Sequence, residues 1–302
     1  MKILLTGATG FIGSHIAENL YHNGVELILT KRNNSNRWRC EVFEKNVKWI
    51  NTDISNWIDE VIKLQPEIII HAAWQGVSAV DREDWNIQYK NLIFLFQLFE
   101  IAKQSKIKKF IGIGSQAEYG EFNAIIDEDF PTNPNSAYSA TKLAASVLVK
   151  AFCEQYTIIW YWFRLFSSFG EREAENWLIP ATIKNMLTKN SMDLSAGEQR
   201  YSYLYVKDIA QYIFNATQVN AASGIYNLSS NESYILKDLI TFVKNKVNPD
   251  FVLNFGALPY RKNQSMLNAS KMGKTNQAFG NVTTDFEENL IQTINYYKEK
   301  YK

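Results

Sequence analysis

Three glycines near the N-terminus constrain the fold of this chain more than any other feature. Gly7, Gly10 and Gly13 follow a short apolar run at residues 2–6 and precede an apolar pattern at residues 16–20. This pattern predicts a buried strand, a tight turn and a helix. In such a turn the first glycine lets the chain leave the strand. The second lets the backbone approach a pyrophosphate, and the third lets helix and strand pack closely.

A glycine-rich turn can also be merely structural. Here the turn lies between a predicted strand and a predicted helix, and a second strand is expected at residues 25–30. The N-terminus of the helix offers unpaired N–H groups and a positive dipole end to a phosphate. We therefore predict a dinucleotide site, with contacts from the turn residues Gly7, Thr9, Gly10, Phe11, Ile12 and Gly13.

Composition excludes several classes of protein. The 302 residues, 46 % hydrophobic and 21 % charged, can bury a full core. No apolar run approaches the ~18 residues of a membrane span, and the N-terminus does not resemble a secretion signal. A net charge of +1 with interspersed signs indicates neither nucleic acid nor membrane as a partner. Two cysteines without CxxC spacing and three scattered histidines predict a reducing, cytoplasmic location and no metal site.

Strand and helix patterns alternate through the first 165 residues. Further strands are expected at residues 47–52, 67–71, 108–114 and 157–166, with helices at 57–64, 84–103 and 136–156. Beyond Gly170 this alternation weakens: helices are expected at 178–187, after Asp208, at 236–246 and from Asp285, and strands at 201–206 and 225–228. The pattern predicts an α/β fold, with a Rossmann doubly wound parallel sheet in residues 1–165. A smaller C-terminal α/β substrate lobe is expected in residues 166–302, with some segments returning to the Rossmann core.

The residues after the second strand bear on the choice of cofactor. Folds that bind NAD usually place an acid there, on the ribose 2′-hydroxyl. This chain instead has Lys31, Arg32 and Asn33. A 2′-phosphate suits a guanidinium, so we predict NADP(H). The alternative is a solvated basic loop without a binding role. Asp53 and Ile54, after the third strand, are expected to meet the adenine.

Small residues follow the fourth strand and leave space for a ligand at the carboxyl edge of the sheet. They are Ala72 and Ala73, with Trp74 next. Asn91 is an isolated polar residue in an apolar helix, and we expect its side chain to hydrogen-bond inside the protein. The remaining predicted cofactor contacts are Ala72, Ala73, Trp74, Asn91, Tyr138, Lys142, Phe166 and Ser168.

Tyr138 and Lys142 are predicted to be catalytic residues. They are four residues apart on a predicted helix and so share one face. A nearby ammonium stabilises a phenolate and can also hold ribose hydroxyls. Ser115, at the end of the fifth strand, can bind a substrate oxygen beside Tyr138. A Tyr-x-x-x-Lys pair alone usually lies on the surface without a functional role. When it follows a dinucleotide-binding turn and a strand that ends in serine, it indicates a catalytic site much more specifically.

The chain resembles the extended short-chain dehydrogenase/reductases, in the NAD(P)-dependent sugar-nucleotide epimerase/dehydratase branch. The resemblance covers essentially the whole length. It includes the glycine turn, Asp53, His71-Ala72-Ala73, Asn91, Ser115 with Tyr119-Gly120, Tyr138 with Lys142, residues 164–170, residues 178–180 and residues 205–210. It implies catalytic roles for Ser115, Tyr138 and Lys142 and a sugar-nucleotide substrate for the C-terminal lobe.

Departures from the family pattern reduce the number of reactions that we expect this chain to catalyse. Dehydratases of the family carry a Thr-Asp-Glu run whose acids perform the elimination, whereas this chain reads Ser115-Gln116-Ala117. The acid that epimerases place after the second strand is also missing. Where many members have Arg-Asp-Phe, this chain has residues Tyr-Ser-Tyr at 201–203. The diphosphate-binding arginine is therefore expected at Arg200 or Arg261.

The Gly-Ser-Gln-Ala-Glu-Tyr-Gly run at 114–120 and the Leu-Pro-Tyr-Arg run at 258–261 most resemble reductases of nucleotide-linked 4-keto-6-deoxyhexoses, such as those that form CDP-abequose or dTDP-fucose. We expect NADPH-dependent reduction at C4 in deoxysugar biosynthesis for surface polysaccharide (O-antigen). Expected substrate contacts are Trp74, Gln116, Ser167, Asn176, Leu178, Arg200 and Arg261. Two alternatives stay open, a sugar-nucleotide 4-epimerase and a non-catalytic dinucleotide sensor.

Two predicted helices are apolar on several faces, at residues 91–103 and 136–156. A helix that packs only on a sheet shows a single apolar stripe. We therefore expect a homodimer through these helices. The alternative is that the substrate lobe covers them.

Overall fold

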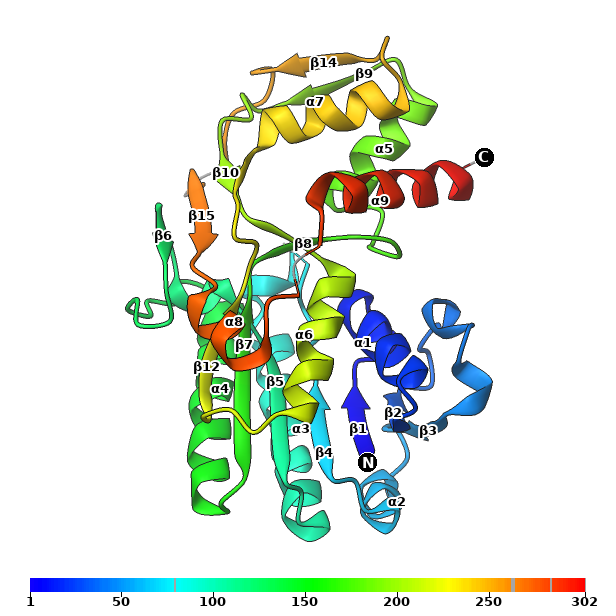
Figure 1. Cartoon of the computed structure of the whole chain (residues 1–302), viewed down its shortest axis with the longest axis vertical. Helices are drawn as coiled ribbons and strands as arrows, with labels where there is room; N and C mark the ends of the chain where they lie inside the picture. Colours follow the sequence, from blue (N-terminus) through cyan, green and yellow to red (C-terminus); the bar gives the residue numbers. More distant parts are fainter. Residues whose placement is uncertain (79, 262–263, 283, 302) are drawn as a thin grey trace.

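The computed structural model describes residues 1–78, 80–261, 264–282 and 284–301. Figure 1 shows a sheet flanked by helices, with a second group of helices and short strands above its carboxyl edge. No helix within the described ranges is long and apolar enough to cross a membrane.

Seven strands form the main sheet, in the order β12-β7-β5-β4-β1-β2-β3. All of their pairings are parallel. This arrangement confirms the predicted α/β fold class. The bounds are β1 (Lys2–Thr6), β2 (Glu26–Lys31), β3 (Lys48–Asn51), β4 (Ile68–His71), β5 (Lys109–Ser115), β7 (Ile159–Leu165) and β12 (Gly224–Leu228).

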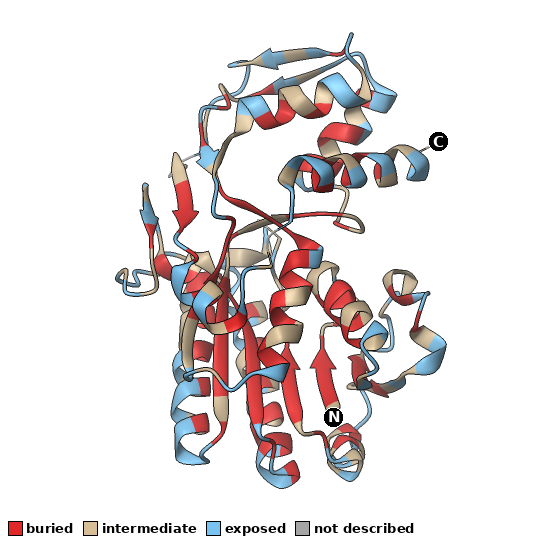
Figure 2. Ribbon diagram, viewed as in Figure 1, coloured by how far each residue is buried: buried red, intermediate tan, exposed pale blue. Residues whose placement is uncertain are grey.

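Helices cover both faces of this sheet (Figure 1). One face packs against α1 (Phe11–His22), α6 (Val206–Gln218) and α8 (Gly273–Phe279). The other packs against α2 (Trp57–Leu64), α3 (Trp85–Ser105) and α4 (Ala137–Gln155). The strands are buried almost throughout, while the outer faces of these helices are exposed (Figure 2). The loop between β2 and β3 holds two short 3₁₀ helices, η1 (Trp38–Cys40) and η2 (Glu44–Asn46).

The upper lobe has its own apolar core. It lies among α5 (Leu178–Thr188), α7 (Leu236–Val247) and α9 (Phe286–Lys300), around Ile183, Val243 and Ile294. Three small sheets complete the lobe and its junction with the main sheet: β13-β10-β15-β6, β11-β8 and β14-β9. Their strands are β6 (Ala124–Ile126), β8 (Ser167–Phe169), β9 (Ser191–Leu194), β10 (Arg200–Tyr201), β11 (Tyr203–Tyr205), β13 (Tyr234–Ile235), β14 (Val252–Phe255) and β15 (Leu267–Ser270).

One expected strand differs from the structure. Residues 201–206 were expected to form a single strand with a helix after Asp208. Instead, β10 pairs with β13 and β15, and β11 pairs with β8 in a separate sheet. Helix α6 begins at Val206, so Asp208 lies in its first turn and its carboxylate accepts hydrogen bonds from the N–H and hydroxyl of Thr284.

Candidate active site

The glycine turn has the geometry expected of a phosphate cradle. Gly7 has φ +78°, and a Cβ there would lie 2.6 Å from the backbone nitrogen of Ala73. A Cβ on Gly13 would lie 2.0 Å from the carbonyl oxygen of Gly7. Gly10 caps α1 without a side-chain hydrogen bond, so the first N–H groups of the helix have no side-chain acceptor at the cap. These features fit the diphosphate of a dinucleotide.

The ends of β2 and β3 are tied together beside this turn. The carboxylate of Asp53 accepts the backbone N–H of Asn33 at 2.7 Å, and the hydroxyl of Ser35 accepts that of Arg32 at 2.9 Å. Arg32, Asn33, Asp53 and Ile54 are all exposed. Within the described parts of the chain, no hydrogen bond or ion pair engages the side chain of Lys31 or Arg32. These two cations are therefore available to a ligand.

The other two arginines of this loop have partners. Arg37 lies 3.6 Å from the carboxylate of Glu44. Arg39 donates to the carbonyl of Arg172 at 2.8 Å and stacks on the Trp38 ring at 4.4 Å. These contacts distinguish Arg37 and Arg39 from the half-buried Lys31 and the exposed Arg32, whose side chains have no such partners in the described chain.

Two amides of α3 hold the loop after β4. Asn91 donates to the carbonyl of Gln75 and accepts its N–H, at 3.1 and 2.8 Å. Gln88 accepts the indole N–H of Trp74 at 3.0 Å and donates to the carbonyl of Gly76 at 2.8 Å. The predicted internal role of Asn91 is thus a backbone clamp on this loop. Gln88 was not singled out, although it lies one turn earlier on the same face.

Tyr138, Lys142 and Ser115 come together at the carboxyl edge of the sheet. Ser115 ends β5, and the other two lie in the first two turns of α4. Helix α4 starts cleanly because Ser136 and Ser139 form a reciprocal capping box. Tyr138 and Lys142 are only 6 % and 5 % exposed. Burial raises the pKa of Tyr138, while a hydrogen bond with Ser115 and the charge of Arg82 lower it.

Aromatic and cationic groups enclose this pair. The guanidinium of Arg82, from the 3₁₀ helix η3 (Asp81–Glu83), lies 4.8 Å from the centre of the Tyr138 ring. The ammonium of Lys142 lies 3.8 Å from the centre of the Trp74 ring and donates to the carbonyl of Ile113 at 2.6 Å. Burial lowers the pKa of Lys142 to about 7, opposed by the charge of Glu118. A phenol and an ammonium are therefore buried side by side on the same face of α4.

The acid nearest to Ser115 faces inward. Glu118 belongs to the 3₁₀ helix η4 (Gln116–Tyr119), which Gln116 begins, and it is 0 % exposed. Its carboxylate forms an ion pair with Arg164 at 2.8 Å and accepts the indole N–H of Trp162 at 2.9 Å. Sequence reasoning missed this group, because its partners lie on β7, far along the chain.

The predicted substrate contacts are spread over several elements. Ser167 is half-buried in β8; of the predicted cofactor contacts beside it, Ser168 is also half-buried and Phe166 is buried. Asn176 is exposed in the loop that leads to α5, and Leu178 is the first residue of that helix. Along the chain these residues follow β7 and lead into α5, the first helix of the upper lobe.

The two candidate arginines lie in different surroundings. Arg200 is exposed, donates to the carbonyl of Ser233 at 3.0 Å, and lines a cavity of about 610 Å³ between α7 and the start of α9. That cavity contains none of Ser115, Tyr138 and Lys142. Successive side chains of a strand point to opposite faces, so Tyr201 faces away from Arg200. Arg261 lies near Tyr201, whose pKa its charge lowers against the larger effect of burial.

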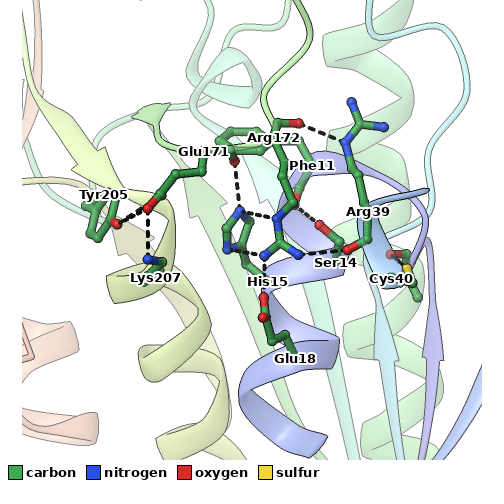
Figure 3. Close-up of polar contacts among 11 residues, drawn as sticks. Phe11, Ser14, His15, Glu18, Arg39, Cys40, Glu171, Arg172, Tyr205 and Lys207 are labelled. Atoms are coloured by element: carbon green, nitrogen blue, oxygen red, sulfur yellow. Dashed lines mark hydrogen bonds and ion pairs between the residues drawn. The ribbon is translucent and has the colours of Figure 1, made fainter. Parts of the chain in front are cut away.

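A polar network links α1 and the loop after β2 to the segment after β8 and to the start of α6 (Figure 3). Arg172 donates to His15 of α1 at 2.7 Å and to the carbonyl of Arg39 at 2.7 Å, and it pairs with Glu18. Burial and the charge of Arg172 lower the pKa of His15 to about 3, so its ring is neutral. Glu171 accepts from Tyr205 and Lys207. No sequence motif indicated this network.

The parallel sheet, the glycine turn and the Ser–Tyr–Lys group define a Rossmann-type enzyme. The chain matches the model of the NAD dependent epimerase/dehydratase family over residues 3–229, and it belongs to that family. The predicted family resemblance is therefore confirmed.

Relatives within the family differ in activity. CDP-abequose synthase of Salmonella muenchen is 25% identical over 277 residues, covering 88% of this chain and 87% of that protein. A putative UDP-glucose 4-epimerase of Methanocaldococcus jannaschii is 29% identical over 259 residues, covering 81% and 82%. The solved UDP-glucose 4-epimerase of Thermotoga maritima with UDP-glucose superposes with a TM-score of 0.90 at 22% identity, over 100% of both chains.

Proposed function

We propose that this protein is an NADPH-dependent reductase of the C4 keto group of a nucleotide-linked 4-keto-6-deoxyhexose, with a CDP- or dTDP-sugar as substrate. The grouping of Ser115, Tyr138 and Lys142 carries the proposal. When bound, NADPH supplies the hydride. Tyr138 donates its phenolic proton to the oxygen that becomes the C4 hydroxyl, Ser115 hydrogen-bonds the same oxygen, and Lys142 orients the ribose and favours proton release from Tyr138.

The inward position of Glu118 favours reduction over dehydration. Elimination of water requires an acid and a base that reach the sugar. Gln116 and Ala117 cannot act as either, and the carboxylate of Glu118 is paired with Arg164 below the site. The resemblance to CDP-abequose synthase agrees with this choice.

A 4-epimerase is the second candidate, favoured by the likeness to epimerases of known structure. One assay separates the two. We expect loss of NADPH absorbance on addition of CDP- or dTDP-4-keto-6-deoxyglucose. Interconversion of a sugar nucleotide at C4 without net use of cofactor would instead establish the epimerase.

Cofactor preference is expected to depend on Arg32. We propose that Lys31 and Arg32 bind the 2′-phosphate, because both are unpartnered within the described chain and lie beside the glycine turn. Arg32→Ala should weaken NADPH about tenfold while leaving NADH within about twofold, as titrated by cofactor fluorescence. Arg37→Ala, which removes a cation paired with Glu44, is the matched control. Equal weakening of NADPH and NADH by Arg32→Ala would contradict the 2′-phosphate role.

We also propose a homodimer through α3 and α4. Trp85, Tyr89, Ile93 and Phe96 form an exposed stripe on α3, and Val147 is exposed on the neighbouring α4. Spacings of three and four residues place the stripe on one side of the helix. Phe96→Glu should convert the dimer to a monomer in sedimentation experiments, because a carboxylate would be buried without a partner. The control is Ile125→Glu, which changes an exposed residue of β6 and should leave the dimer intact. A wild-type protein that sediments as a monomer would refute the proposal.

The two cysteines fit a cytoplasmic enzyme, which we propose as well. Cys40 and Cys153 are free and buried, and burial raises the pKa of their thiols to about 11 and 12. Such thiols are inert and do not need an oxidising compartment.

A further inference from the structure

Glu118 occupies an unusual position for a carboxylate. It is fully buried at the base of the catalytic group and receives hydrogen bonds from three residues on two strands, β5 and β7. The backbone N–H of Ser115 donates to Oε1 at 2.9 Å, the Trp162 indole donates to Oε1 at 2.9 Å, and Arg164 donates through Nε to Oε2 at 2.8 Å. These three donors take the place of water around the buried carboxylate.

The surrounding chain leaves room for this carboxylate. A Cβ on Gly114 would lie 2.5 Å from Oε1 of Glu118 and 2.2 Å from Nε1 of Trp162. A Cβ on Gly112 would lie 2.2 Å from the Trp162 ring. The two glycines of β5 thus let the indole and the carboxylate meet directly beneath Ser115.

The first consequence is geometric. Glu118 accepts the N–H of Ser115, while the hydroxyl of Ser115 accepts the N–H of Ala117, so the two residues cap η4 reciprocally. The Glu118 carboxylate thereby fixes the backbone of Ser115. Its hydroxyl is held at the end of β5, within reach of Tyr138.

The second consequence is electrostatic. The charged or titratable groups around Lys142 and Tyr138 are Glu118 from η4, Arg82 from η3 and His71 from β4. Burial and the charge of Lys142 lower the pKa of His71 to about 3, so its ring is neutral. Glu118 is therefore the negative charge that opposes the desolvation of Lys142. The same charge raises the pKa of Tyr138 and so favours the protonated phenol.

We propose that Glu118 is a positioning residue: its buried carboxylate fixes the backbone of Ser115 and, through Trp162, whose ring centre lies 5.8 Å from the Lys142 ammonium, holds a negative charge beneath the catalytic group. This role rests on the proposed reduction. It explains why the chain has a buried glutamate at position 118, where the carboxylate cannot contact the sugar.

The test is Glu118→Gln, which preserves shape and removes the charge. Without the carboxylate, the pKa of Lys142 falls, so the ammonium is lost at lower pH. We expect kcat near pH 6.5, just below the Lys142 pKa of about 7, to fall about tenfold or more, with the alkaline limb of the profile shifted to lower pH and the sugar KM nearly unchanged. Glu128→Gln, which also loses a carboxylate bound to a backbone N–H, should leave the profile as in the wild type.

Two further measurements separate this role from simple support of the fold. The Lys142 titration is followed by NMR of protein labelled at lysine Cε, with Lys142→Ala for assignment. The double variant Glu118→Gln/Arg164→Gln, which removes the arginine that would otherwise lose its buried partner, should regain thermal stability but keep the lowered Lys142 titration.

An unchanged Lys142 titration in Glu118→Gln overturns the proposal, as does a double variant that regains both stability and the wild-type titration. These outcomes do not depend on the substrate. If the wild type reduces neither keto sugar, the proposed function fails, while the NMR titration still decides the role of Glu118.

Discussion

Tyr138→Phe is expected to lower kcat about 10³-fold while leaving the affinity for NADPH close to that of the wild type. The phenylalanine ring keeps the edge contact with Trp74 and the stacking of Arg82, so the pocket stays packed. Only the hydroxyl that we propose as the proton donor is lost. Water cannot replace it readily, because the residue is 6 % exposed. Stopped-flow absorbance with a 4-keto sugar nucleotide measures the chemical step directly.

The matched control for this change is Tyr119→Phe. It removes another buried phenolic hydroxyl, which donates to Asn227 at 2.8 Å on the far side of η4. Its expected effect is a loss of about 1 kcal/mol of stability, with turnover preserved. Substantial turnover by Tyr138→Phe would assign the proton donor elsewhere. An unchanged biological role of a Tyr138→Phe variant without turnover would instead favour the non-catalytic sensor.

Gly13→Ala is expected to damage both the fold and cofactor binding. The new methyl group would lie 2.0 Å from the carbonyl oxygen of Gly7, which is backbone and cannot rotate away. Helix α1 must then move off β1, at an expected cost of about 3 kcal/mol in the free energy of unfolding. The displaced helix no longer presents its N–H groups to the diphosphate, so cofactor affinity should also fall. Thermal denaturation and fluorescence titration measure the two effects.

Gly273→Ala is the control for this prediction. Gly273 begins α8, and a Cβ there would meet nothing within 4 Å. Alanine at such a position should leave stability unchanged or raise it by about 0.5 kcal/mol. A Gly13→Ala variant that denatures and binds cofactor like Gly273→Ala would show that close packing of α1 on β1 is not required.

The parts of the site that could be predicted are local in the sequence. The three glycines lie within seven residues, and Tyr138 and Lys142 are one helical turn apart, so spacing alone places them. The α/β fold class followed from alternating apolar runs and is confirmed. The family followed from the same motifs, together with Ser115 at a strand end.

The parts that could not be predicted depend on distant pairings. Arg164 reaches Glu118 across 46 residues, and Arg172 reaches His15 across 157. Nothing in the local sequence of either partner indicates the other. The split of residues 201–206 into β10 and β11 has the same origin, because each half pairs with a strand that is remote in the chain.

Strand β12 carries a consequence for the synthesis of the protein. It pairs with β7 and closes one edge of the main sheet, yet it is made about sixty residues after β7 ends. Until it leaves the ribosome, the apolar β7 is an open edge that other chains can pair with. Helix α6, which packs against α1 and β5, begins about forty residues after β7 ends. A fragment ending at residue 165 should therefore aggregate, and chaperone protection of the nascent chain is needed longest over that interval.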